Sequence, residues 1–329
     1  MSKKSDFKLS TRIGGGRFSD VLKCTKISTG QQYALKLIEP DDERPPHNAR
    51  NELRILQRLN DNGESRNKNV VPLIDYFTNS MEIGFVLPLY QTNLTELIKS
   101  RCKTRSHFGM DGKITKRTQN NLKKDEIKHI FKGVLNALKF IHSQDIIHRD
   151  INPNNVMFSN QGDGEPLDPV LIDFGISFQK PDNFGGELYN DKITDIATGY
   201  YKAPELLLTI RDYDETVDIW STGVMLMLMS SEDGTVSTYS EDCKYSDLAL
   251  LSSILNSFGS PPSTWPEAQN SRSFKSLNEN FFTKTRKSVD ELIPKLKDDD
   301  QIVEVFQNIM VFERAKRLSA AKALEILDS

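Results

Sequence analysis

The sequence predicts an α+β fold of two lobes, in which a small antiparallel β-sheet with one helix precedes a larger, mostly α-helical part. Three observations predict it: short apolar segments with a period of two, glycine turns between them, and apolar residues at helical spacing from residue 125 onward. We place a tail at residues 1–10, the first lobe at 11–87, a connector at 88–93 and the second lobe at 94–329. A chain of 329 residues has room for two lobes or for two medium-sized domains, each able to bury a core.

The composition excludes several classes of protein. A hydrophobic content of 37% with 27% charged residues is typical of soluble globular proteins, and the net charge of -3 gives no reason to expect a nucleic-acid or membrane partner. No apolar run approaches the roughly 18 residues of a membrane span, and the first ten residues lack the core of a signal peptide. The three cysteines, Cys24, Cys102 and Cys243, are too widely spaced for a disulfide framework or a zinc site. We therefore expect a reducing compartment, the cytoplasm or the nucleus.

The first lobe begins with three predicted strands within residues 11–39. A turn at Gly30 and alternating apolar residues indicate an antiparallel sheet: Val21, Tyr33, Leu35 and Leu37. Gly14 and Gly16 keep the first hairpin free of side chains, so that its backbone amides can lie close to phosphate oxygens. A plain hairpin would carry the same glycines.

A lysine and a glutamate are the candidate functional charges of this lobe. Lys36 follows the small residue Ala34 on the third strand and precedes a helix that carries Glu52. Three signals bound that helix: Pro45-Pro46, a candidate cap at Asn48 and a stop near Asn62-Gly63. The alternative for Lys36 is a surface lysine whose stem lies along the sheet.

The middle of the chain reads as two strands, a helix, an insertion and a long helix. Strands are predicted at 70–77 and 82–90, and Asn93 can cap the next helix. Residues 101–124 are polar and basic without periodicity, which indicates a solvated surface loop, with a docking or targeting role as the alternative. The helix at 125–144 has an apolar face made of Ile127, Ile130, Phe131, Val134, Leu138 and Ile141.

The strongest chemical signal is residues 147–155, I-H-R-D-I-N-P-N-N. Asp150 and, five positions on, Asn155 can lie on one tight loop. There a carboxylate can accept a hydroxyl proton and an amide oxygen can bind a metal. Two further motifs follow in order, Asp173-Phe174-Gly175 and Ala203-Pro204-Glu205.

This segment resembles the catalytic loop of eukaryotic protein kinases, H-R-D-x-x-x-x-N, and the other motifs occur in that family's order. The resemblance implies a bilobal protein kinase fold that uses ATP and Mg²⁺ to phosphorylate a protein substrate. It implies Asp150 as the catalytic base and an ion pair from Glu52 that holds Lys36 on the α- and β-phosphates. Asn155 and Asp173 are the implied Mg²⁺ ligands.

The resemblance also implies the ATP-binding residues. The pattern G-x-G-x-x-G-x-V is matched except that Ser19 replaces the third glycine, which stiffens the loop tip. Leu87 corresponds to the gatekeeper behind the adenine, and the backbones of Pro88 and Tyr90 read the adenine edge. Asn93 stands near the ribose unless it caps the helix. The implied set is Ile13, Gly14, Gly15, Gly16, Val21, Ala34, Lys36, Leu87, Pro88, Tyr90, Asn93 and Met157.

Three contacts inside the large lobe are implied as well. Phe174 packs under the helix that bears Glu52, touching Leu56 and His148. The other two are Asp218 as a tether of the catalytic-loop backbone and an ion pair of Arg317 with Glu205.

Two features leave the activity and its control open. Asn152 stands where serine/threonine kinases usually carry a lysine that neutralises the γ-phosphate, so we weigh an active enzyme against a nucleotide-binding scaffold and favour the enzyme. Arg149 commonly pairs with an activation-loop phosphate in this family. Either Thr194 is phosphorylated here, or its acidic flank, Asp191 and Asp195, serves instead and the enzyme is constitutively active.

The C-terminal half and the helix that carries Glu52 indicate which protein kinases the chain resembles most. Residues 250–267 resemble the corresponding region of cyclin-dependent and related kinases, but Arg50 stands where those kinases bury an isoleucine in the cyclin. The stretches PPHNAR and DKITDIATGYYKAPELLL are similar to the fungal single-chain CDK-activating kinases. That likeness implies a monomer that phosphorylates the activation-loop threonine of a cyclin-dependent kinase without a cyclin. Another serine/threonine kinase of the group is the alternative enzyme.

Overall fold

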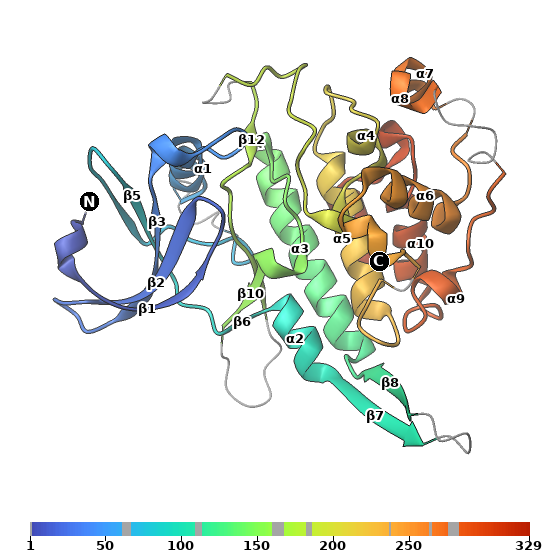
Figure 1. Cartoon of the computed structure of the whole chain (residues 1–329), viewed down its shortest axis with the longest axis horizontal. Coiled ribbons are helices and arrows are strands. Elements are labelled where there is room, and N and C mark those ends of the chain that lie inside the picture. Colours follow the sequence, from blue (N-terminus) through green and yellow to red (C-terminus); the bar gives the residue numbers. More distant parts are fainter. Residues whose placement is uncertain are drawn as a thin grey trace.

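The computed structural model describes residues 2–60, 67–108, 114–159, 168–181, 186–236, 238–262, 265–275 and 283–329. Figure 1 shows a β-sheet lobe with the helix α1 (Ala49–Asn60) beside it, joined to a larger helical lobe. The predicted α+β class is therefore confirmed. No described helix is both long enough and apolar enough to cross a bilayer.

The small lobe is a five-stranded antiparallel sheet in the order β1-β2-β3-β5-β4. Its strands are β1 (Phe7–Gly15), β2 (Ser19–Lys26), β3 (Gln32–Ile38), β4 (Asp75–Thr78) and β5 (Ile83–Leu87). The predicted tail at 1–10 is wrong in its second half, because Phe7 is buried with Cys24 and Leu35 and starts β1 there. The strand predicted at 70–77 is also shorter, since Val70 instead forms a bridge with Leu171 of the large lobe.

The helix α1 begins where its caps predict. The Asn48 side-chain oxygen accepts the backbone N–H of Asn51 at 2.9 Å, and the Glu43 carboxylate accepts that of Ala49 at 2.8 Å. The backbone N–H of Asn48 also donates to the carbonyl of Gly175 at 3.0 Å, which ties the helix start to the large lobe. The predicted stop at Asn62-Gly63 lies outside the described residues.

The large lobe is built around two helices, α3 (Lys124–Ser143) and α5 (Thr216–Ser230). The apolar face predicted for α3 is buried, and α5 is buried on nearly every side, as its long apolar run predicts. The other helices are α2 (Leu94–Arg101), α4 (Pro204–Leu207), α6 (Asp247–Phe258), α7 (Pro266–Asn270), α8 (Arg272–Lys275), α9 (Val289–Leu292), α10 (Asp300–Ile309) and α11 (Ala320–Asp328).

Short strands next to α3 carry the loops of the site. One sheet has the order β11-β10-β6, and a second pairs β12 with β9. These strands are β6 (Thr92–Asn93), β9 (Ile146–Ile147), β10 (Val156–Phe158), β11 (Pro169–Leu171) and β12 (Phe178–Gln179). Residues 147–155 therefore leave β9 and return into β10 as one closed loop.

The insertion at 101–124 is a β-hairpin, which corrects the prediction of a solvated loop. Strand β7 (Cys102–Phe108) pairs with β8 (Ile114–Asn120), and the hairpin extends away from α2 and the large lobe (Figure 1). The β-branched Thr104 and Thr118 stand directly opposite each other with their hydroxyls 3.0 Å apart, a pairing that polarity patterns do not detect. Residues 109–113 lie outside the described part.

Candidate active site

The loop at 147–155 is held by one buried carboxylate from α5. Asp218 is 1% exposed, and its oxygens accept the backbone N–H groups of His148 at 2.9 Å and Arg149 at 2.8 Å. The third partner of Asp218 is Nε2 of His142 at 2.9 Å. The implied tether is therefore present. Arg149 is held at φ 71°, a left-handed conformation that costs free energy for a residue with a side chain and recurs at functional sites.

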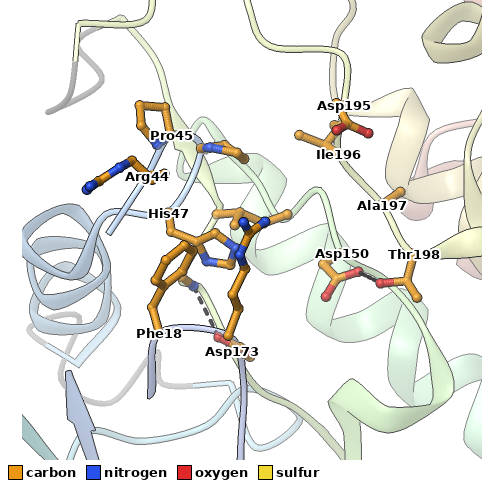
Figure 2. A pocket seen from close by; sticks show the side chains of 14 residues that line it. Phe18, Arg44, Pro45, His47, Asp150, Asp173, Asp195, Ile196, Ala197 and Thr198 are labelled. Atoms are coloured by element: carbon orange, nitrogen blue, oxygen red, sulfur yellow. Dashed lines mark hydrogen bonds between the residues drawn. The ribbon is translucent and has the colours of Figure 1, made fainter. Parts of the chain in front are cut away.

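Asp150 and Asn155 face each other across this loop. The Asn155 Nδ2 donates to the Asp150 backbone oxygen at 2.9 Å and to its Oδ2 at 2.8 Å. The amide oxygen of Asn155 has no hydrogen bond within the described chain, so it is available to a cation. The Thr198 hydroxyl donates to Asp150 Oδ1 at 2.8 Å (Figure 2), which shows that this carboxylate can accept a hydroxyl hydrogen.

Asn152 supplies loop structure instead of charge. Its side chain is 3% exposed, accepts the backbone N–H of Asn154 at 2.9 Å and donates to the Asp150 backbone oxygen at 3.2 Å. An amide can make both of these bonds, whereas a lysine could make only the donating one.

Lys36, Glu52 and Asp173 form a three-membered charge cluster between the lobes. Lys36 Nζ lies 2.7 Å from Glu52 Oε1 and 2.8 Å from Asp173 Oδ1, so the alternative of a surface lysine is wrong. Lys36 and Glu52 are 8% and 2% exposed. The backbone of Asp173 has φ 65°, a second left-handed residue at this site.

The cluster separates the pKa values of its two carboxyl groups. Burial raises the pKa of Glu52 to about 7, although Lys36 opposes this shift. Burial also disfavours ionised Asp173, but Lys36 outweighs it and lowers the pKa of Asp173 to about 2. Burial likewise disfavours charged Lys36, and the two carboxylates outweigh it and raise its pKa. Asp173 is therefore the carboxylate that stays ionised beside a bound cation.

The glycine turn at the end of β1 has one position that only glycine fits. A Cβ on Gly15 would lie 2.6 Å from the carbonyl oxygen of Ser19, whereas one on Gly14 would make only ordinary contact with Val21. The Ser19 hydroxyl accepts the backbone N–H of Gly16 at 3.2 Å. That bond occupies a loop amide and is consistent with a stiffer loop tip.

Strand pairing brings the residues implied for adenine binding toward one another. Ala34 stands opposite Leu87 in the β3–β5 register, and Met157 stands opposite Asn93 in the β10–β6 register. Pro88 and Tyr90 lie between those strands, in the connector. Asn93 was expected either near the ribose or as a helix cap. The structure shows the cap, because its side-chain oxygen accepts the backbone N–H of Glu96 at 2.9 Å. Ile13 remains 47% exposed beside the glycine turn.

A cavity of about 290 Å³ joins the catalytic loop to the glycine turn. Asp150, Asp173 and Thr198 line it together with residues from the loop before β2 and from the loop before α1 (Figure 2). Phe18 and His47 meet edge to face with their ring centroids 4.9 Å apart, and Arg17 adds positive charge. These three residues were not selected in the sequence, because they occupy variable positions of their stretches, and the contact of Phe18 with His47 joins two loops about 30 residues apart in the chain.

Other implied contacts are also seen. The rings of Phe174 and His148 meet edge to face with centroids 4.9 Å apart. Arg317 pairs with Glu205 at 2.7 Å, and both side chains are buried. Every described histidine on α3 has a structural partner, because His129 contacts Asp168 and His142 contacts Asp218.

Arg149 pairs with a carboxylate that the sequence analysis did not select. Its guanidinium donates to both oxygens of Glu187, at 2.9 and 3.0 Å, and the backbone N–H of Ile193 donates to Glu187 Oε1 at 2.7 Å. The predicted acidic flank is wrong in its members: Asp191 pairs with Arg211 and Asp195 with Lys202. Glu187 was missed because no spacing rule links it to Arg149.

A buried lysine anchors the activation segment, which runs from Asp173 to Glu205. Lys192 has no exposed surface and donates to the carbonyl oxygen of Tyr189. Its Nζ lies 4.5 to 5.3 Å from the ring centroids of Tyr189, Tyr213 and Phe178, and burial with nearby Arg149 lowers its pKa to about 8. The activation segment is therefore tied to the large lobe by the chain's own side chains.

Comparison with known proteins agrees with this geometry. The protein kinase domain model matches residues 7–326. Serine/threonine-protein kinase CAK1 of Saccharomyces cerevisiae is 29% identical over 73% of the chain and 71% of that protein. Mitogen-activated protein kinase hog1 of Aspergillus clavatus is 29% identical over 95% of the chain and 74% of that protein, and cyclin-dependent kinase 20 of Danio rerio is 27% identical over 95% and 80%. The chain belongs to the protein kinase family, as a serine/threonine kinase of the group that contains cyclin-dependent and mitogen-activated kinases.

Proposed function

We propose that this kinase transfers the γ-phosphoryl group of ATP to the activation-loop threonine of a cyclin-dependent kinase, as a monomer and without a cyclin. The observation that carries the proposal is that two internal ion pairs, Lys36 with Glu52 and Arg149 with Glu187, are both formed within one chain. In an enzyme that waits for a second subunit or a phosphate, these pairs are the ones left open.

The roles in transfer follow from the contacts. Asp150 would accept or orient the proton of the incoming hydroxyl, as it now does with Thr198. Lys36 would hold the α- and β-phosphates while Glu52 fixes its position. The Asn155 amide oxygen and the second oxygen of Asp173 have no hydrogen bond in the described chain and suit Mg²⁺, which prefers oxygen ligands and neutralises phosphate charge.

The adenine would lie between the lobes. Val21, Ala34 and Met157 would contact its faces, with Leu87 behind it and the connector backbone along its edge. Ile13 and the three glycines would cover the nucleotide, and the Gly15 position leaves no room for a side chain, because a Cβ there would lie 2.6 Å from the carbonyl oxygen of Ser19.

Support for the finer substrate assignment comes from the surface of α1 and from similarity. Arg50 is exposed on α1, where an apolar anchor would be needed to bury this helix in a cyclin. The similarity to CAK1 favours the same assignment. The hog1 similarity, which covers more of the chain, favours the second candidate, a kinase of the same group with other protein substrates.

One reaction separates these candidates. Purified protein is incubated with ATP, Mg²⁺ and a monomeric cyclin-dependent kinase that is itself inactivated, and phosphothreonine is located by mass spectrometry. We expect transfer to the activation loop of that kinase and a monomeric enzyme on size-exclusion chromatography. Transfer only to a generic protein substrate would select the second candidate, and no transfer to either would select a scaffold.

The Glu187 carboxylate is expected to supply the negative charge that a phosphorylated activation loop would otherwise offer to Arg149. Glu187→Gln leaves Arg149 buried without a counter-charge. We expect kcat/KM to fall by about 100-fold, because the activation segment is no longer held in position. Thr194→Ala should leave kcat/KM unchanged in protein shown by mass spectrometry to be unphosphorylated. Asp191→Asn is the matched control, because it breaks an exposed ion pair in the same segment. Dependence of activity on Thr194 would reverse this assignment.

Asn152 is expected to limit the rate. In Asn152→Lys the added cation can approach the transferred phosphoryl group, so we expect kcat to rise by about tenfold. The free energy of unfolding should fall by about 1 kcal/mol, because the side-chain bond to the Asn154 backbone is lost. Asn152→Ala should show the same loss of stability without the gain in kcat. Unchanged kcat in Asn152→Lys would indicate that another cation already neutralises the γ-phosphate, and Arg17, which lines the cavity with Asp150, would be the candidate.

A further inference from the structure

The β7–β8 hairpin carries a groove whose charge has no use in phosphoryl transfer. We call it the basic groove: a cavity of about 450 Å³ lined by Lys103, Arg105, Arg117 and Lys295, with Glu232 as the carboxylate among its lining residues. The hairpin side chains of this set are exposed, and Lys295 is half-buried. A groove of this size with four cations is matched to an anionic occupant.

The strand register places like charges on one face. Arg105 stands directly opposite Arg117, and Lys103 lies two residues along the same face. None of these three side chains has an ion pair within the described chain. Like charges directly opposite each other destabilise a pair of strands, so a bound anion would relieve a repulsion that the free hairpin carries.

Lys295 forms a fixed cation in the groove. Its Nζ donates to the backbone oxygens of Asn120 at 2.9 Å and Leu122 at 3.2 Å. An ammonium group has three N–H donors, so one is left for an occupant in the part of the chain that the structure describes. Burial lowers the pKa of Lys295, and an anion beside it would oppose that shift.

The base of the hairpin is rigidly attached to the end of α5. Asn120 is 3% exposed, and its Nδ2 donates to the backbone oxygens of Met229 and Ser231, each at 3.0 Å. Its backbone N–H donates to the carbonyl of Glu232 at 2.7 Å. A groove built on a fixed base loses little conformational entropy when it is filled.

A second cavity next to the basic groove indicates which anion fits. It shares Arg117 and Glu232 with the groove, and Lys116 and the carboxylates of Asp233, Asp290 and Glu291 also line it. A long nucleic acid or an anionic membrane would meet those carboxylates as well as the cations, whereas a short acidic peptide can contact the basic groove alone. Charge complementarity therefore favours an acidic protein segment.

The hairpin is joined to the catalytic loop through α2. The Thr95 hydroxyl at the start of α2 donates to Asn154 Oδ1 at 2.7 Å, and β7 continues directly from the end of that helix. A helix of eight residues spans about 12 Å, which an extended protein segment of a few residues can bridge.

We propose that the basic groove docks an acidic segment of the protein substrate, away from the residue that is phosphorylated. The inference rests on the proposed function only in requiring a protein substrate. Its first test measures binding without catalysis, so its failure is distinguishable from failure of the kinase assignment.

The binding test uses the full chain and a fluorescein-labelled peptide of alternating aspartate and glycine, read by fluorescence anisotropy at low and high salt. We expect Arg105→Glu to weaken binding by about tenfold. Lys116→Glu, the matched control, lies on the other face of the hairpin and should change binding by less than about twofold. Arg105→Glu should fold at least as well as the wild type, because it faces Arg117 with an opposite charge.

The kinetic test compares one acceptor peptide alone with the same peptide joined to the acidic segment by a flexible linker. Arg105→Glu should raise KM about tenfold for the joined peptide only and leave kcat unchanged. Equal weakening by Lys116→Glu, no binding of the acidic peptide, or tighter binding of single-stranded RNA or of phosphatidylserine vesicles would each overturn the proposal.

Discussion

Asp150→Asn is expected to lower kcat by about 10³-fold while leaving the affinity for ATP within about twofold of the wild type. Asparagine keeps the size of the side chain but cannot accept a proton from the incoming hydroxyl. The carboxylate now accepts hydrogen bonds from Thr198 and Asn155, each at 2.8 Å, which places it at the meeting point of the loop and the activation segment. Steady-state kinetics with a protein substrate and calorimetric titration with ATP measure the two effects.

Thermal unfolding provides the control for this variant. The backbone of the loop is held by Asp218 and not by Asp150, so the melting temperature of Asp150→Asn should stay near that of the wild type. A variant that kept more than about a tenth of wild-type kcat would show that Asp150 is not the base, since a positioned base contributes about 10²–10⁴-fold.

The parts of the site that could be predicted from the sequence are those fixed by local chain geometry. Asp150 and Asn155 share one tight loop, so their spacing alone brings them together. Lys36 and Glu52 required one further step, because a lysine on a strand and a glutamate on the next helix meet only if that helix packs against the sheet. The resemblance to protein kinases implied that contact, whereas the helix caps predicted only where the helix begins.

The parts that could not be predicted depend on which loops meet in space. Glu187 reaches Arg149 across 38 positions of sequence, and no periodicity marks either residue. The hairpin at 101–124 was hidden because polar strands lack the apolar alternation on which strand prediction depends. Phe7 began a strand earlier than predicted because its burial is decided by Cys24 and Leu35, which follow it in the chain.

Lys36→Met is expected to abolish activity and also to destabilise the small lobe. Loss of the cation should lower kcat/KM by about 10²–10³-fold, because the phosphates lose their charged contact. Glu52 is then left 2% exposed without its partner. Breaking a buried ion pair in this way should reduce the free energy of unfolding by about 3–5 kcal/mol at pH 8, measured by urea denaturation.

The pH dependence of this loss has a definite sign. The pKa of Glu52 in the folded wild type is raised from 4.5 to about 7, so the stability linked to this group is full below pH 4.5 and lost as pH rises toward 7. Without Lys36 the pKa of Glu52 rises further, and the loss of stability continues above pH 7. The difference in unfolding free energy between wild type and Lys36→Met should therefore be smallest at acidic pH and grow above neutrality.

A second substitution separates the two roles of the pair. In Lys36→Met/Glu52→Met the buried pair is replaced by apolar side chains, whereas the side chain of Asp173 is 45% exposed and can be solvated without Lys36. The free energy of unfolding at pH 8 should therefore recover most of the loss and no longer show the pH dependence that comes from Glu52. Activity should stay as low as in Lys36→Met, because the phosphates still lack their cation. If the double variant were no more stable than the single one at pH 8, unpaired Glu52 would not be the cause of the loss.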